Sequence, residues 1–295
     1  MKKIYFTLCL LIIIGFAPDC IAETVESVSD KSVPASTTSL VPSSDNPTPI
    51  IPADTKNNFH LEIGGNCNWL DNDYGQWKGL NLSLNYSGFK GITPSLSIAR
   101  LSRKEGSQFI YGFGSYIDIT SKSYMTLGIS GAPVKDPNVI IYPRLRLDLG
   151  YYFSTPLVDG LVFSTGITHY PKQNGGGGDS ISIGGIYYWK IILQGSLSYN
   201  IARPGNITSL SQQAGFMVGA QGKYWFGGGA TGGREAYQMP KTNPPFQVRF
   251  RGYGAYLFYN KWIGKDWGIN TRLDVGQKVD AYKLVGITAS LFMDF

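Results

Sequence analysis

The chain contains only two histidines, and their positions limit the acid–base chemistry that it could perform. His60 lies at the start of the first predicted strand, whereas His169 ends a later strand, with Ser164 and Ser180 nearby in the sequence. A serine activated by a histidine can attack an acyl group, so this spacing permits a lipid-modifying enzyme built around His169. The simpler interpretation, which we favour, is an interfacial histidine that contacts lipid headgroups beside Tyr170.

No other group of residues has the spacing of a catalytic or metal site. No cluster of His, Cys, Asp or Glu matches the spacing of metal ligands. The run 175–178 consists of glycines with no helical pattern after it, so it predicts a flexible loop rather than a phosphate-binding turn. Removal of the N-terminal segment described below would leave Cys67 alone, which excludes an intramolecular disulfide. We therefore predict a non-enzymatic protein with no catalytic residue, no metal and no cofactor.

Arginines recur on the polar faces of the predicted strands. They are Arg144, Arg146, Arg249, Arg251 and Arg272. A charge that faces lipid at the middle of the bilayer costs about 2 to 4 kcal/mol, so we predict that all five line an interior lumen. A basic lumen would favour anionic solutes or polymers. The alternative, which the sequence leaves open, is a plugged interior in which they form structural pairs with lumenal carboxylates. Those carboxylates would be Asp148, Glu235 and Asp274.

The elements that position these residues are β-strands. Over residues 59–295, apolar and polar residues alternate with the period of two that is typical of strands. In the clearest strand, Leu145 and Leu147 share one face, whereas Arg146 and Asp148 share the other. Because the two faces cancel in any average, the mean hydropathy is only -0.08. The pattern predicts an all-β fold, a transmembrane antiparallel up-and-down β-barrel.

About fourteen strands can be placed, and most reach the roughly 9 to 11 residues needed to cross a bilayer at a tilt. They are predicted at 59–69, 76–87, 94–103, 107–118, 122–131, 141–153, 160–169, 179–189, 190–201, 211–226, 228–238, 247–260, 266–276 and 283–295. An even number returns the C-terminus to the side of the N-terminus, as in single-chain barrels. The boundary at 189–190 is tight, so twelve strands remain an alternative. Outer loops are predicted at 132–140, 171–178, 202–210 and 239–246.

The last strand carries the most specific signal. Apolar residues step back by twos from the end of the chain, through Phe295, Met293 and Leu291. A terminal aromatic residue on such a strand is the mark by which the outer-membrane assembly machinery recognises its clients. The strand must present an apolar face to lipid while it pairs with the first strand, since no unpaired edge persists in hydrocarbon. We therefore expect outer-membrane lipids and this machinery as partners, and no nucleic acid.

Two segments that precede the predicted barrel differ from it in composition. Two lysines precede an apolar run over 4–16, which predicts a cleaved signal peptide over residues 1–22. Residues 23–58 are rich in Ser, Thr and Pro, which predicts a disordered periplasmic leader. The predicted organisation is therefore a signal peptide, a leader and a barrel domain over 59–295, located in the cell outer membrane.

Four short motifs stand out within the alternating region. They are Tyr142-Pro143-Arg144-Leu145-Arg146-Leu147, His169-Tyr170, Tyr187-Tyr188-Trp189 and Gly233-Arg234-Glu235. With them, the chain resembles the YaiO family of outer-membrane β-barrel proteins over about 59–295. The resemblance implies a barrel in the outer membrane but no activity that could be carried over. Members are associated with surface polysaccharide systems, which implies, by analogy, polysaccharide export components as partners.

Together these patterns predict a non-enzymatic integral outer-membrane barrel. We expect it to give passage, or a docking site, to an anionic or polysaccharide-type polymer or solute. Two alternatives stay open. One is the lipid-modifying enzyme that uses His169. The other is a surface adhesin, although the predicted outer loops are short for broad recognition.

Overall fold

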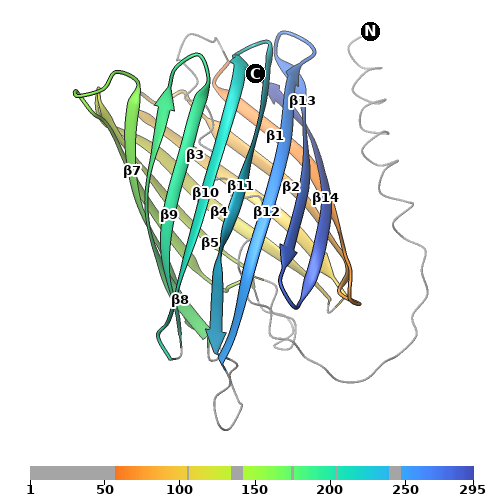
Figure 1. The fold of residues 1–295 in the computed structure, drawn as a ribbon. Helices are drawn as coiled ribbons and strands as arrows, with labels where there is room; N and C mark the ends of the chain where they lie inside the picture. Colours follow the sequence, from red (N-terminus) through yellow and green to blue (C-terminus); the bar gives the residue numbers. More distant parts are fainter. Residues whose placement is uncertain (1–56, 105, 134–141, 174–175, 204, 239–246) are drawn as a thin grey trace. The chain divides into compact units, whose positions relative to one another are not determined.

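The computed structural model describes residues 57–104, 106–133, 142–173, 176–203, 205–238 and 247–295. They form one closed barrel of fourteen antiparallel strands (Figure 1). The predicted signal peptide and nearly all of the predicted leader lie outside the described residues. The described residues contain no apolar helix of membrane-spanning length. The all-β prediction is confirmed, with fourteen strands rather than twelve.

The strands follow one another around the barrel in chain order. Their bounds are β1 Phe59–Leu70, β2 Gly75–Tyr86, β3 Ile92–Arg103, β4 Gly106–Thr120, β5 Ser123–Gly131, β6 Arg146–Ser154, β7 Leu161–Gln173, β8 Gly176–Tyr188, β9 Ile192–Arg203, β10 Ile207–Ala220, β11 Tyr224–Gln238, β12 Gln247–Trp262, β13 Trp267–Lys278 and β14 Tyr282–Asp294.

The barrel closes where β1 pairs with β14, with His60 opposite Asp294. At the end of this seam, Phe59 and Phe295 exchange two backbone hydrogen bonds of 2.9 Å each. Closure leaves no strand edge, which is what a sheet needs in order to persist in hydrocarbon. The beginning of β1 and the end of β14 therefore share one rim, the upper one in Figure 1, which we call the terminal rim. The opposite rim is called the far rim.

The far rim carries the two longest connections, over 132–145 and 239–246, whereas 155–160 is the longest connection at the terminal rim. Outer-membrane barrels have short periplasmic turns and longer extracellular loops. We therefore assign the terminal rim to the periplasm and the far rim to the cell exterior.

The two faces of the wall differ in residue type and exposure. Large apolar side chains that face outward, such as Leu96, Ile183 and Leu257, are about half exposed. On β9 the inward positions are mostly polar, and none of them is buried. A barrel of eight strands is just wide enough to be filled by its own side chains, and the diameter grows with strand number. A barrel of fourteen strands is therefore wider than one that its own side chains just fill.

The described residues form no central core. Two small apolar clusters line the inside of the wall near the far rim instead. In one, Leu284 and Leu70 pack with Tyr282. The other consists of Ile110, Ala132 and Tyr142. Packing in this fold is therefore local to neighbouring strands, and stability depends on the closed ladder of backbone hydrogen bonds.

Two predicted outer loops, 171–178 and 202–210, are wrong, because strands occupy most of both ranges. Strand β7 continues to Gln173 and β8 begins at Gly176, so the glycine run belongs to a hairpin. A Cβ atom added at Gly178 would lie 2.6 Å from the backbone oxygen of Ile201. Glycine is therefore required there by the close approach of β8 and β9, rather than by loop flexibility.

Candidate functional site: the barrel lumen

Arg146 points into the lumen, as predicted, and is paired there. Its Nε atom lies 2.8 Å from Oδ2 of Asp148, two residues further along β6. Asp148 also accepts a hydrogen bond of 2.7 Å from the hydroxyl of Thr168, and the guanidinium lies over the ring of Tyr170. The arginine side chain is only 14% exposed. Its charge is therefore largely compensated within the wall.

Arg272 on β13 repeats this arrangement. Its guanidinium donates hydrogen bonds of 2.7 and 2.9 Å to Oδ1 of Asp274. It also lies 4.0 Å from the centre of the Tyr256 ring. In both strands the sequence pattern Arg-x-Asp places the two charges on the same inward face. Arg146 and Arg272 therefore form the pairs with lumenal carboxylates that the sequence left open as an alternative.

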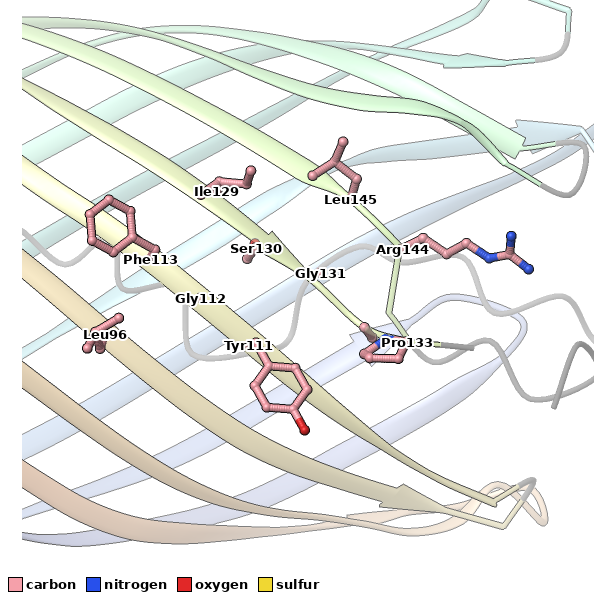
Figure 2. Close-up of a pocket in the computed structure, with 11 residues that line it drawn as sticks. Leu96, Tyr111, Gly112, Phe113, Ile129, Ser130, Gly131, Pro133, Arg144 and Leu145 are labelled. Carbon is pink, nitrogen blue, oxygen red and sulfur yellow. The ribbon is translucent and has the colours of Figure 1, made fainter. Parts of the chain in front are cut away.

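Arg144 does not lie on the lumenal face of a strand, contrary to the prediction. Strand β6 begins at Arg146, so Arg144 lies before it and is exposed. It lines a groove of about 710 Å³ whose other walls include the outward-facing side chains of Leu96, Tyr111 and Ile129. In Figure 2 its side chain points away from these apolar residues. Alternation fixes the facing of a residue only inside a strand, and this segment is irregular.

The lumenal position is also wrong for Arg251, which is exposed on the outward face of β12 with Tyr253 and Leu257. The free-energy cost of a charge that faces lipid does not exclude this position, because near the membrane interface that cost is only about 0 to 1 kcal/mol. Arg249 pairs through its backbone with Ala236 of β11, and its side chain lies outside the described part of the structure.

The inward charges of the described residues show no excess of positive charge. The cations are Arg103, Arg146, Arg272 and Lys278, and the carboxylates are Glu62, Asp118, Asp148, Asp274 and Asp294. The basic character of the chain therefore does not reside on the described lumenal face.

One wall of the lumen carries hydroxyl and amide groups without any charge. Across β8, β9 and β10, the inward polar residues are Ser180, Ser182, Gln194, Ser196, Ser198, Asn200, Ser209, Ser211 and Gln213. Groups of this kind donate and accept hydrogen bonds without attracting ions of either sign. The chemistry of this wall fits a neutral, hydroxyl-rich solute.

A second feature of the lumen was missed by the sequence analysis. Tyr116, Tyr124 and Tyr152, from β4, β5 and β6, lie side by side near the terminal rim, and we call them the tyrosine ladder. Their ring centres are 4.6 Å apart for the first pair and 4.5 Å apart for the second. Each tyrosine lies on the polar face of its strand, so the alternation pattern could have predicted its lumenal position. The ladder presents aromatic surface at the terminal rim.

His169 faces outward near the far rim, and its Nδ1 atom lies 2.6 Å from Oδ1 of Asp179 on the next strand. Arg203 is bonded to the other oxygen of the same carboxylate. Ser164 and Ser180 pair with inward residues of neighbouring strands. The wall of the barrel thus separates His169 from both serines that the sequence placed near it.

His60, by contrast, is inward at the terminal rim, and its Nδ1 atom lies 2.7 Å from Oδ1 of Asp294. No group of three or more His, Cys, Asp or Glu residues that could hold a metal ion exists among the described residues.

The predicted assembly signal faces outward at the end of β14. Leu291 lies opposite Ile63 of β1 and Ile269 of β13, and Met293 continues the same face. The ring of Phe295 stacks on that of Phe59, with centres 5.4 Å apart.

A closed antiparallel barrel with an apolar outer surface and a polar interior is a membrane-spanning barrel, and such barrels belong to the outer membrane. Residues 58–238 match the YaiO membrane β-barrel domain. The chain belongs to this family and is an outer-membrane protein.

Solved outer-membrane barrels are similar to this chain at very low sequence identity. A bacterial polysaccharide outer-membrane secretin matches with a TM-score of 0.53 at 8% identity, over 82% of this chain and 100% of its own. The anion-selective porin of Comamonas acidovorans matches with a TM-score of 0.45 at 10% identity, over 80% and 98%. OprD of Pseudomonas aeruginosa matches with a TM-score of 0.46 at 9% identity, over 81% and 95%. A search of curated protein sequences found no significant match.

Proposed function

We propose that this barrel is a non-enzymatic passage for a sugar-based polymer, which enters past the tyrosine ladder and moves along the uncharged wall of β8, β9 and β10. The observation that carries the proposal is the chemistry of the described lumenal face, which offers hydroxyl, amide and aromatic groups and no excess of positive charge. For this reason we place a polysaccharide-type cargo ahead of an anionic solute.

The physical basis is the match between the lining and a chain of sugar rings. Pore selectivity follows from the hydrogen-bonding groups and the charge that line the passage. Sugar hydroxyls can exchange water for serine, asparagine and glutamine side chains at little net cost. The apolar faces of sugar rings pack against aromatic rings such as those of the ladder. The secretin noted above is named for the same class of cargo, although its likeness to this chain concerns the fold alone.

We therefore expect a neutral hexasaccharide to block ion current through the refolded protein in planar bilayers. Replacing Tyr124 and Tyr152 by leucine should raise the half-blocking concentration about tenfold, because aromatic contacts of about 0.5 to 1.5 kcal/mol each are lost. Tyr151→Leu is the matched control, since Tyr151 lies beside Tyr152 but faces outward. Single-channel recordings at increasing hexasaccharide concentrations give the half-blocking concentration of each protein.

Three outcomes would count against this function. If the wild-type barrel never conducts ions, it does not form a passage. If the double variant and Tyr151→Leu have the same half-blocking concentration, the ladder does not contact the sugar. Stronger block by a negatively charged hexasaccharide than by the neutral one would restore the anionic cargo. Polysaccharide export components remain proposed partners on the periplasmic side.

A second candidate function is a lipid-modifying enzyme, which the contact between His169 and Asp179 favours. A carboxylate on Nδ1 orients the histidine for proton transfer at Nε2. The cross-strand neighbour of His169 on β6 is Leu147, which supplies no nucleophile. We expect His169→Ala to leave the lipid A and phospholipid profiles of cells unchanged, as measured by mass spectrometry. A loss of one lipid species in this variant alone would favour the enzyme.

A further inference from the structure

Arg234 and Arg251 lie directly opposite each other on β11 and β12, near the far rim. Both are exposed. Arg251 shares the outward face of β12 with Tyr253, Leu257 and Tyr259, and cross-strand partners share a face. We propose that this arginine pair binds the phosphate group of an outer-leaflet lipid, so that the barrel holds a specific lipid against β11 and β12.

The height of the pair along the barrel fits the level of lipid headgroups. On the outward face of β12, the uncharged residues Tyr253, Ala255, Leu257 and Tyr259 lie between Arg251 and Lys261. Arg251 lies just beyond the first tyrosine and Lys261 just beyond the second. At about 3.4 Å per residue and a tilt of about 40°, these two cations are about 26 Å apart along the barrel axis. This matches the apolar band of about 25 Å that spans the membrane.

The charges around the pair favour an anion. Like charges directly opposite each other on a sheet are destabilising, and an anion placed between them would relieve the repulsion. Among the described residues of β10 to β14, no carboxylate lies on the outward face. The situation differs at Arg203 on β9, whose guanidinium is already bonded to Asp179. The nearest cation on β13, Lys278, is inward over the ring of Tyr282.

The chemistry of two adjacent guanidinium groups fits a phosphate group. Each can bind two oxygens of one phosphate through parallel hydrogen bonds. Cross-strand Cβ atoms are about 4.5 to 5.5 Å apart, so both groups can reach the same phosphate. The apolar surface below them faces the acyl chains of the same lipid.

The test uses the full-length protein in phosphatidylethanolamine nanodiscs that contain a small fraction of lipid A. Native mass spectrometry measures how many lipid A molecules stay bound to each barrel. We expect the variant Arg234→Gln/Arg251→Gln to retain about tenfold less lipid A than the wild type, because charge-assisted hydrogen bonds are lost. Lys261→Gln is the matched control, since Lys261 lies on the same face of β12 at the opposite rim. It should retain as much as the wild type.

Several results would overturn the proposal. The wild type should retain dephosphorylated lipid A as poorly as the double variant retains lipid A. Equal retention of lipid A and dephosphorylated lipid A by the wild type would show that phosphate is not recognised. Displacement of lipid A by millimolar inorganic phosphate would show a simple anion site rather than a lipid site. An unchanged double variant would also refute it. If the double variant fails to insert, Arg234→Gln alone is measured, and it must still lower retention.

Discussion

Replacing Phe295 by aspartate is expected to reduce the amount of folded barrel in the outer membrane by about tenfold or more, without affecting export. Phe295 exchanges two backbone hydrogen bonds with Phe59 and stacks on its ring at the closing seam. It also ends the apolar face by which we expect the assembly machinery to recognise β14. A charge there is unfavourable for both closure and recognition. Heat-modifiable migration in gels measures the folded fraction.

Phe89→Asp is the control for this prediction. Phe89 is about as exposed as Phe295 and lies at the same rim, but it sits in the turn between β2 and β3. It should assemble nearly normally, and Phe295→Tyr should do the same because it retains an aromatic ring. Undiminished folded barrel in Phe295→Asp would show that the terminal residue has no role in assembly.

The second large effect is expected at the Arg146–Asp148 pair. Arg146→Gln leaves the carboxylate of Asp148 without its cation, so the lumen should become more selective for cations. Asp148→Asn should shift selectivity toward anions, and the variant with both changes should return close to the wild type. At an effective dielectric of about 20, a unit charge about 15 Å from a passing ion contributes roughly 1 kcal/mol, or about a fivefold change in its local concentration.

Reversal potentials under a salt gradient measure these shifts. Arg203→Gln removes one positive charge from the outward face of the barrel and should leave the selectivity nearly unchanged. If Arg146→Gln and Arg203→Gln have the same small effect, the pair does not face the conducting path. If the double variant differs strongly from the wild type, the two charges do not compensate each other as their contact indicates.

Much of the fold was predictable because alternation is a local property of the chain. Residues two apart on a strand share a face whatever the partners are. The strand number, the outward face of β14 and the inward position of Arg146 all followed from this rule. The glycines at the start of β8 were misread as a loop because composition alone does not show that β9 passes so close to Gly178.

The sequence by itself therefore determined the class of protein, the number of strands and the facing of residues inside strands, since a bilayer demands apolar residues at every second position. The tertiary structure alone decided which residues meet across strands and at what height. Arg251 took an outward position because it lies at the interface, where an outward charge is tolerated, and Arg144 is not held on the lumenal face because it precedes its strand. Tyr116, Tyr124 and Tyr152 became neighbours through pairing of β4, β5 and β6. Charge and aromatic surface in the lumen depend on such pairings, and pairing is a property of the closed barrel rather than of any one strand.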